Sequence, residues 1–313
     1  MTLVSRKISG KSYYYSSLSY YLTDKSKSFS KYIGAKRPTN SELVRIESKF
    51  RAEIIKKLAN KAYTSDNISQ DEIIRTIIFR DLFNKKYEKL TLLNRRKYDI
   101  DSTVLFTLTT LTTEEVDVSL DDIKNALEKD SYLTQREQIS KNMLNAVDSI
   151  RQSRILDMKY LLELHKMTMA SFETKTPGQI RTKQVYLHKI AEDNPLGVEL
   201  SYRPPAFIKI SELLDEFVKW YNSTKLNPIE KATLAHYKLY RIHPFLDGNK
   251  RICRLIFNKA LLDEGFPLLN ISLEKEEYFE ALIESVEKDK AVTLVNFTLK
   301  QYYKQVKEFV TKV

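Results

Sequence analysis

The sequence contains only one cysteine, Cys253, among 313 residues, and this excludes an internal disulfide framework. It has four histidines, and no Cys/His cluster has the spacing of a zinc site. We find no signal peptide and no apolar run of membrane length, so we expect a cytoplasmic protein that does not enter a membrane. Only six glycines interrupt long segments with helical periodicity, which predicts a mainly α-helical fold.

Basic residues outnumber acidic residues, 52 to 41, which gives a formal net charge of +11. Such a charge suits an acidic protein surface, nucleic acid or ATP as a partner. Basic runs such as residues 94–97 are short, however, and the charge is spread along the chain. A solvated basic surface is therefore the default interpretation.

The most informative segment is HPFLDGNKRICR, residues 243–254. Before it, apolar residues at near-helical spacing in residues 227–242 predict a buried helix that delivers His243. Pro244 ends this helix, because its ring removes a donor and clashes with the preceding turn. A second helix is predicted to begin near Asn249, so its free N–H groups and positive dipole end point into the loop. The loop is therefore a candidate anion site.

The side chains of this loop add the chemistry of group transfer. Arginine forks match phosphate oxygens, and glycine lets the backbone approach an anion closely. Asp247 would repel phosphate unless Mg²⁺ lies between them, and His243 can accept a proton near neutral pH. Base, metal ligand and phosphate cradle together indicate nucleotide-dependent group transfer. The candidate phosphate-binding residues are Gly248, Asn249, Lys250, Arg251 and Arg254.

This segment resembles the Fic motif, HPFx(D/E)GNxRxxR, of the Fic/Doc (Fido) proteins, most of which transfer AMP from ATP to a hydroxyl of a target protein. Flanking segments such as PGQIRTKQVYL and RLIFNKALLDEGFPLL are also similar to Fic-domain sequences, and this similarity extends over roughly residues 150–290. The resemblance implies a Fic-type helical bundle with a β-hairpin flap. It also implies Mg-ATP as the AMP donor, Asp247 as the metal ligand, and His243 as the base for a Ser, Thr or Tyr hydroxyl.

Residues 179–190 alternate polar and apolar side chains, which predicts a strand or hairpin. In Fic proteins this position is the flap, which clamps a segment of the target protein as an added strand. The resemblance places the flap tip, with its nucleotide and target contacts, at Leu187, His188, Lys189 and Ile190. His188 is interpreted as a flap contact and not as a catalyst. Tyr278 and Phe279 similarly resemble the aromatic positions that contact the nucleotide base.

Residues 110–114 (TLTTE) match the first five positions of the (S/T)xxxE(G/N) helix found in self-inhibiting Fic proteins. In those proteins the glutamate pairs with the second arginine of the motif, here Arg254. A carboxylate there removes a phosphate donor and places negative charge beside the triphosphate. The resemblance therefore implies inhibition by Glu114, with Thr110 opening the motif, although Glu115 replaces the usual Gly or Asn. An ordinary Thr-rich helix start remains the alternative.

Lys250 stands where the commonest Fic pattern has glycine, and the related Doc toxins, which transfer phosphate, have Asn-Lys-Arg. Because Pro244, Gly248 and Arg254 match the AMP-transferring proteins, we favour adenylylation and keep phosphorylation as the leading alternative. Two further alternatives are removal of AMP from a modified target, with water oriented by Glu114, and a basic nucleic-acid-binding module without enzymatic activity.

Residues 2–36 contain three segments rich in Tyr and Ser, which predict a β-hairpin or a three-stranded meander. These tyrosines and lysines could bind nucleic acid by stacking and charge, but aromatic residues are also good strand formers, and we prefer that structural role. A docking or homo-oligomer element is also left open. We expect a β-rich leader at 1–36, a helical region with the candidate inhibitory helix at 37–150, and a Fic domain with a closing helix at 151–313.

Overall fold

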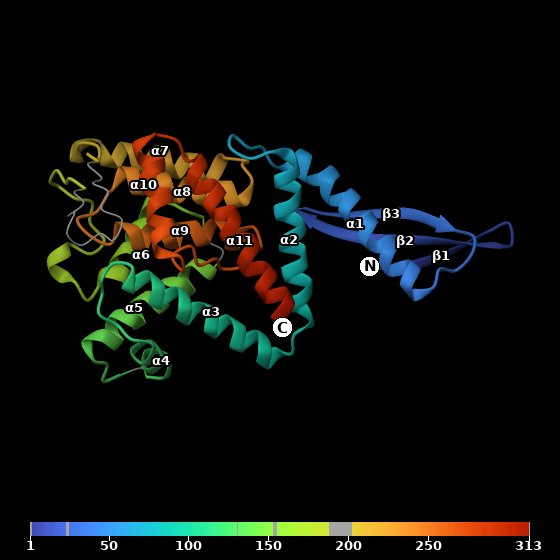
Figure 1. Ribbon diagram of the computed structural model, residues 1–313, viewed down its shortest axis with the longest axis horizontal. Helices are drawn as coiled ribbons and strands as arrows, with labels where there is room; N and C mark the ends of the chain where they lie inside the picture. Colours follow the sequence, from blue (N-terminus) through green and yellow to red (C-terminus); the bar gives the residue numbers. More distant parts are fainter. Residues whose placement is uncertain (1, 23–24, 130, 153–154, 188–201, 313) are drawn as a thin grey trace. The chain divides into compact units, whose positions relative to one another are not determined.

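The computed structural model describes residues 2–22, 25–129, 131–152, 155–187 and 202–312. The chain forms two compact units, residues 1–81 and residues 82–313, and the boundary falls inside helix α2 (Gln70–Lys89). The first unit contains the strands and the second is helical (Figure 1). The mainly helical class predicted from the sequence is confirmed.

The first unit is built on a three-stranded antiparallel sheet. Its strands are β1 (Thr2–Ile8), β2 (Lys11–Leu22) and β3 (Lys25–Gly34), in the order β1-β2-β3 (Figure 1). Ser9 and Gly10 both have positive φ, at 49° and 80°, the geometry of the tight turns that join twisted antiparallel strands. The predicted meander is therefore confirmed.

Helix α1 (Asn40–Ala62) covers one side of this sheet. It begins with a capping box, in which the Thr39 hydroxyl accepts from the Glu42 N–H and the Glu42 carboxylate accepts from the Thr39 N–H. The sheet contributes Leu18 and Tyr20 to the buried core of this unit. The helix contributes its own buried face, which consists of Phe50, Ile54, Ile55, Leu58 and Ala59.

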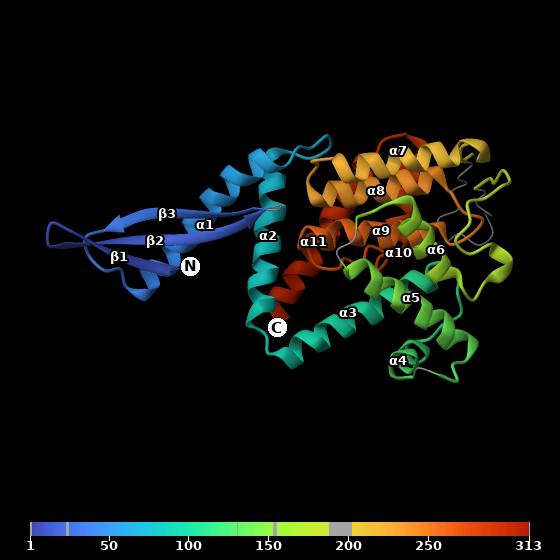
Figure 2. The same ribbon diagram turned by 180° about the vertical axis from the view of Figure 1, so that it is seen from behind.

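The second unit packs its helices around α9, which contacts α3, α5, α6 and α8 (Figures 1 and 2). Residues on all sides of α9 are buried, as expected for a central helix. This burial fixes the start of α9, and with it the loop between α8 and α9. The helices are α3 (Leu92–Thr112), α4 (Leu120–Glu128), α5 (Gln135–Arg151), α6 (Met158–Met169), α7 (Ile210–Ser223), α8 (Pro228–Ile242), α9 (Asn249–Asp263), α10 (Lys275–Glu287) and α11 (Val292–Lys312).

Two local expectations differ from the structure. The predicted strand over residues 179–190 is wrong for residues 179–186, which form no strand. The reason is Arg181, whose backbone N–H donates to Pro244 at 2.9 Å, so this segment bonds to the loop and not to a neighbouring strand. The threonine-rich segment ends helix α3 at Thr112 and does not start a helix. Among the described residues, no helix combines the length and apolar character needed to cross a membrane.

Candidate active site

His243 is the residue that ends α8. Its backbone is left-handed, with φ 48° and ψ 62°, and its N–H donates to the Leu239 carbonyl at 3.0 Å. The side chain is only 8% exposed, and burial lowers its pKa from 6.5 to about 4. His243 is therefore neutral at pH 7 and able to accept a proton.

Gly248 forms the turn into α9 and has φ 74°. A Cβ at this position would lie 2.6 Å from the sulfur of Met169, so both the backbone conformation and the space require glycine. Asn249 then begins α9, where the first N–H groups have no acceptor within the helix. Its side chain closes the loop, because its oxygen accepts from the Phe245 N–H at 3.0 Å and its amide donates to the Phe245 carbonyl at 2.9 Å. The backbone N–H of Asn249 is thus available to an anion, whereas its side chain is bonded to the Phe245 backbone.

His165 and Arg181 fix the position of this loop, and sequence reasoning gave neither of them this role. His165 is buried and stacks on Phe245 with ring centroids 3.7 Å apart. Its Nδ1 accepts from the Gly178 N–H at 2.9 Å, so its other nitrogen carries the hydrogen and donates to the Asp247 carbonyl at 3.0 Å. Burial lowers the pKa of His165 to about 4.

Arg181 binds the same loop and is 1% exposed. Its Nε donates to the His243 carbonyl at 2.8 Å, and another guanidinium nitrogen donates to the Pro205 carbonyl at 2.7 Å. The one available sequence signal is an arginine within the otherwise alternating segment QIRTKQV. That signal does not identify a partner 62 residues away.

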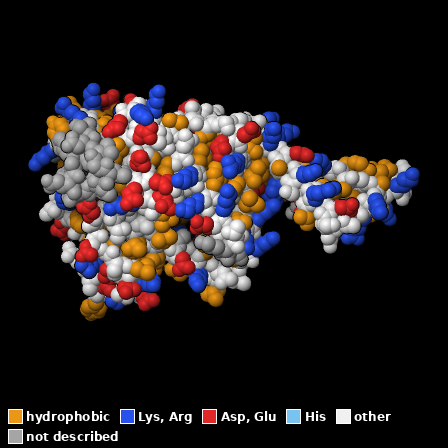
Figure 3. Space-filling model, viewed as in Figure 1, with side chains coloured by type: hydrophobic (Ala, Val, Ile, Leu, Met, Phe, Trp, Pro, Cys, Tyr) orange, Lys and Arg blue, Asp and Glu red, His pale blue; other side chains and the backbone are white. Residues whose placement is uncertain are grey.

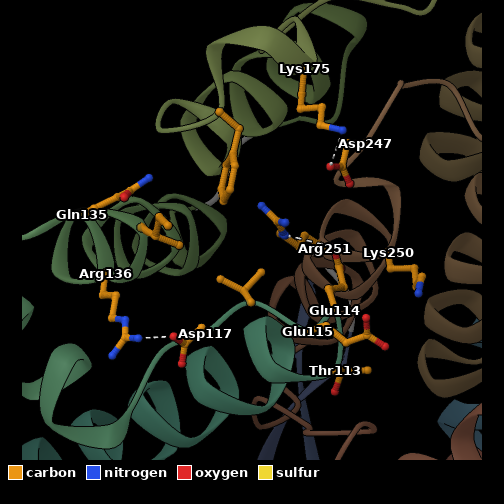
Figure 4. A pocket seen from close by; sticks show the side chains of 13 residues that line it. Thr113, Glu114, Glu115, Asp117, Gln135, Arg136, Lys175, Asp247, Lys250 and Arg251 are labelled. Carbon is orange, nitrogen blue, oxygen red and sulfur yellow. Dashed lines mark hydrogen bonds and ion pairs between the residues drawn. The ribbon is translucent and has the colours of Figure 1, made fainter. Parts of the chain in front are cut away.

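Arg251 and Arg254 meet at the carboxylate of Glu114, which follows the end of α3. Figure 4 shows Arg251 beside Glu114. Arg251 Nε donates to one carboxylate oxygen at 3.0 Å, and Arg254 donates to the other at 2.7 Å. Arg254 also donates to the Thr110 carbonyl at 2.9 Å. The side chains are 4%, 0% and 8% exposed for Arg251, Arg254 and Glu114, so water screens these ion pairs very little. Both arginines of the motif are therefore occupied by the chain's own carboxylate.

Glu115 has φ +60°, in the left-handed region that side chains other than glycine and asparagine seldom adopt. Its N–H donates to the Thr112 carbonyl at 3.1 Å, and the following Val116 N–H donates to Leu111 at 3.2 Å. These bonds end α3 and turn the chain so that Glu114 faces α9 (Figure 4). The position after the glutamate thus has a backbone conformation that Gly or Asn adopts most readily.

A cavity of about 720 Å³ opens in front of these groups (Figure 4). In its lining, Asp247 and Lys175 form an ion pair, with 3.9 Å between the nearest charged atoms (Figure 4). On another wall Arg136 pairs with Asp117. The cavity therefore presents charges of both signs. It is lined by Thr113, Glu114, Glu115, Val116, Asp117, Gln135, Arg136, Ile139, Phe172, Lys175, Asp247, Lys250 and Arg251.

Asp247 suits a metal ion that is shared with a bound phosphate. One of its oxygens accepts from the Gly248 N–H at 2.6 Å, and the side chain is 39% exposed at the cavity. Across the described residues, no group of three or more His, Cys, Asp or Glu is arranged to hold a metal. A single carboxylate is sufficient for Mg²⁺, which often binds one or two carboxylates plus substrate phosphates. The residues present therefore fit Mg²⁺.

Lys250 and the two aromatic residues of α10 lie beside this region. The Lys250 ammonium is 5.1 Å from the centre of the Phe279 ring, and burial lowers its pKa. Phe279 is half-buried, whereas Tyr278 is fully buried and its hydroxyl lies 2.9 Å from His236 Nε2. Phe279 is thus available at the edge of the site, and Tyr278 is part of the core.

The predicted flap is described only in part. Leu187 and Tyr202 form an antiparallel bridge, with N–H to carbonyl distances of 3.0 and 3.3 Å. His188, Lys189 and Ile190 lie outside the described residues. The Tyr202 hydroxyl also donates to the Arg241 carbonyl at 3.1 Å, so the bridge lies beside the end of α8.

Residues 155–261 match the family model described as "Fic/DOC family". This segment is similar to Fic domains. Curated relatives include "Protein adenylyltransferase fic-1" of Caenorhabditis briggsae, 35% identical over 126 residues, which are 39% of this chain and 22% of that protein. Another is "Protein adenylyltransferase Fic" of Drosophila erecta, 33% identical over 138 residues, or 43% and 26% of the two chains. The chain thus matches about a quarter of the length of these relatives.

Solved structures support the same fold. A Fic domain containing signaling protein from Bacteroides thetaiotaomicron has a TM-score of 0.63 at 20% identity, covering 76% of this chain and 95% of that one. Fic-1 from C. elegans has a TM-score of 0.61 at 22% identity, covering 88% and 78%. The similarity includes helices outside residues 155–261, and the Fic-type helical bundle expected from the sequence is confirmed.

Proposed function

We propose that this protein is a protein adenylyltransferase whose resting site is inhibited by Glu114. It would transfer AMP from Mg-ATP to a Ser, Thr or Tyr hydroxyl of a target protein. The observation that carries the proposal is the occupation of both motif arginines by one buried carboxylate, beside a neutral histidine and the N-terminus of α9. The names of the curated relatives support AMP transfer in particular.

The chemistry needs a base, an anion site and an alignment of the two reactants. His243, held neutral by burial, removes the proton as the target hydroxyl attacks the α-phosphorus of ATP. The bond from that phosphorus to the oxygen bridging to the β-phosphate breaks, and pyrophosphate leaves. The first N–H groups of α9, with Arg251 and Arg254, stabilise the negative charge of the phosphates. Asp247 would hold Mg²⁺, which supplies further charge neutralisation when bound.

Glu114 would inhibit by charge and by occupancy. With its carboxylate on Arg251 and Arg254, these guanidiniums have fewer free donors for phosphate, and the triphosphate meets a negative group. The distal phosphates would then settle in a position that does not align the α-phosphorus. Any trigger must therefore withdraw Glu114 from α9.

The target would be presented by the flap. A target segment that adds as a strand near Leu187–Ile190 would gain main-chain hydrogen bonds, and these would place its hydroxyl beside His243. The antiparallel bridge between Leu187 and Tyr202 supports strand pairing by Leu187. Competition by a short peptide from an identified target would test this docking.

Lys250 is the observation that favours a second candidate, phosphate transfer. Its ammonium lies over Phe279, next to the region where a nucleotide would bind. It therefore adds positive charge that could reverse the orientation in which the triphosphate binds. The test uses the Glu114→Gly variant incubated with ATP labelled at either the α- or the γ-phosphate. Adenylylation predicts protein labelling from α-labelled ATP, and loss of that label in the Glu114→Gly/His243→Ala double variant.

Labelling from γ-labelled ATP alone would overturn adenylylation in favour of phosphate transfer. Release of AMP from a previously adenylylated target, without net labelling, would favour the reverse reaction instead. A Lys250→Gly substitution in the same background separates the first two outcomes further. If the lysine directs the orientation of ATP, this substitution changes the ratio of α- to γ-labelling.

A further inference from the structure

The two arginines of the motif are held by different parts of the fold. Arg254 donates to the Glu114 carboxylate at 2.7 Å and to the Thr110 carbonyl at 2.9 Å, and both acceptors lie at or just after the end of α3. Arg251 also donates to Glu114, at 3.0 Å, but two further contacts come from the end of α6. Withdrawal of α3 would therefore release Arg254 and leave Arg251 with part of its support.

Met169 and Phe172 are the two residues that contact Arg251 from the end of α6. The Arg251 Nη1 donates to the Met169 sulfur at 2.9 Å, and the guanidinium carbon lies 5.0 Å from the centre of the Phe172 ring. A thioether is a weak acceptor and the face of an aromatic ring attracts a cation, so both contacts favour one orientation of the guanidinium. Neither contact brings a negative charge, so neither repels a phosphate.

Glu114 and Met169 engage different nitrogens of Arg251. A guanidinium binds an oxyanion best through two parallel N–H bonds, and Nε with Nη2 forms one such pair. Glu114 accepts from the Nε of this pair, whereas Met169 accepts from Nη1, which is outside it. If Glu114 withdraws, the pair is released while Nη1 stays bonded to the sulfur. The contact with Met169 is therefore compatible with phosphate binding, and the contact with Glu114 is not.

The end of α6 is fixed by its own neighbours. Met169 is fully buried, and its sulfur also lies against the Gly248 turn, where an added β-carbon would come within 2.6 Å of it. The Phe172 N–H donates to the Met169 carbonyl at 2.8 Å, so both side chains project from one tight turn. Ser171, between them, accepts from the Asn142 amide of α5 at 2.9 Å. None of these contacts involves a residue of α3.

We propose that Met169 and Phe172 are positioning residues that hold the Arg251 guanidinium in its phosphate-binding orientation after Glu114 withdraws. In this division of roles, Arg254 responds to the position of α3, and Arg251 is oriented in both states. An arginine that is already oriented loses less side-chain freedom when it binds the triphosphate, which strengthens binding. The inference rests on the proposed function, because it concerns the same phosphate site.

The surface of the helical unit gives local contacts of this kind more weight. On the face shown in Figure 3, acidic and basic side chains of this unit are intermixed. Such a face offers no broad positive field that could orient a triphosphate from a distance. The orientation of the phosphates then depends on the individual cations of the site, and on the groups that hold those cations in place.

The test measures the dissociation constant of Mg-ATP by titration calorimetry in the Glu114→Gly background. Phe172→Leu removes the aromatic face, and Met169→Leu removes the sulfur with little change in volume. We expect each substitution to weaken ATP binding about two- to five-fold. Phe172→Tyr keeps the aromatic face and should restore most of the affinity. Met158→Leu, roughly 16 Å away at the other end of α6, is the matched control and should leave the affinity unchanged.

A second set of variants shows whether these residues act through Arg251. When Arg251→Ala is also present, Phe172→Leu and Met169→Leu should weaken ATP binding no further, because the group that they orient is gone. Equal losses with and without Arg251 would indicate a general structural effect and overturn the proposal. Unchanged affinity for both variants in the presence of Arg251 would overturn it as well.

AMP transfer measured on the same proteins separates this inference from the proposed function. If Glu114→Gly transfers no AMP but its ATP affinity follows the expected pattern, the proposed reaction fails and the positioning role stands. If Glu114→Gly transfers AMP and neither Phe172→Leu nor Met169→Leu changes its ATP affinity, the positioning role fails and the reaction stands.

Discussion

Glu114 and Glu115 are adjacent carboxylates with different roles at the end of α3. Glu114 is buried between two guanidiniums, whereas Glu115 is exposed and has a left-handed backbone. For a residue with a β-carbon, the left-handed backbone conformation costs about 1–2 kcal/mol, a cost that glycine avoids. The chain thus keeps a strained residue next to the group that occupies its site.

Replacing Glu115 tests this strain. We expect Glu115→Gly to raise the free energy of unfolding by up to about 1 kcal/mol, because glycine relieves the left-handed strain but is more flexible when unfolded. Glu115→Ala removes the same carboxylate and keeps the β-carbon, so it should bring no gain. Urea unfolding measures both. Equal stability of the Gly and Ala variants would show that the backbone is unstrained.

The site residues that sequence could predict are those whose chemistry is local. His243, Asp247 and Gly248 come from one short segment, and its spacing already indicates a base, a metal ligand and a tight turn. His165 and Arg181 are different, since they bind the loop from 82 and 62 residues away. Such pairings depend on tertiary packing, which no local pattern encodes.

At the scale of elements, α3 is held to the other helices of its unit by more than Glu114. Buried Asn270, which lies between α9 and α10, donates to the Thr109 hydroxyl at 2.7 Å and to the Leu105 carbonyl at 3.4 Å. Its own N–H donates to Gln305 of α11 at 3.1 Å. The end of α3 is therefore docked by a polar anchor one turn before the inhibitory residue.

Loosening this anchor should release inhibition in part. Thr109→Val removes the hydroxyl bonded to Asn270 with little change in shape, and the loss of one hydrogen bond, about 1 kcal/mol, raises the undocked population roughly five-fold. We expect a similar rise in AMP transfer. Thr112→Val is the matched control, because its exposed hydroxyl bonds only within α3, to Leu108. If both variants transfer AMP at the wild-type rate, undocking of α3 does not limit the reaction.

Prediction of secondary structure from the sequence succeeded for the helices and was less successful for the segments that connect them. Apolar periodicity located α8 and α9 because both helices bury a continuous stripe, and Pro244 and Gly248 mark the ends. The strand prediction for residues 179–186 failed because it rested on alternation alone. Arg181 in this segment directs its hydrogen bonds to the His243 loop and not to a neighbouring strand. Periodicity reports which side chains are buried and does not report which backbone groups pair.

At the scale of the whole molecule, three buried histidines link stability to pH. Burial lowers the pKa of His165 and His243 to about 4 and that of His236 to about 3, from 6.5. Between these values and 6.5, the unfolded chain binds protons that the folded chain excludes. Stability conferred by the neutral imidazoles is therefore complete above about pH 7 and decreases as pH falls towards 4.

As the pH falls from 7 to 5, each of these histidines should lower the free energy of unfolding by up to about 2 kcal/mol. All three lie in the second unit, as does Trp220, the single tryptophan of the chain, so its fluorescence can follow urea unfolding of that unit. We predict a marked decrease in the unfolding midpoint from pH 7 to 5 and little change from pH 7 to 8. A midpoint that stays constant down to pH 5 would mean that the histidines titrate normally in the fold.

The most direct test of the account is the intact mass of the purified protein after incubation with Mg-ATP. The Glu114→Gly variant should gain the mass of one or more AMP groups, while the wild type gains little. Glu115→Ala, which removes the neighbouring carboxylate and leaves both arginine pairs, should behave as the wild type does. Equal AMP incorporation by the wild type and Glu114→Gly would contradict inhibition by Glu114, and phosphate additions in place of AMP would contradict adenylylation.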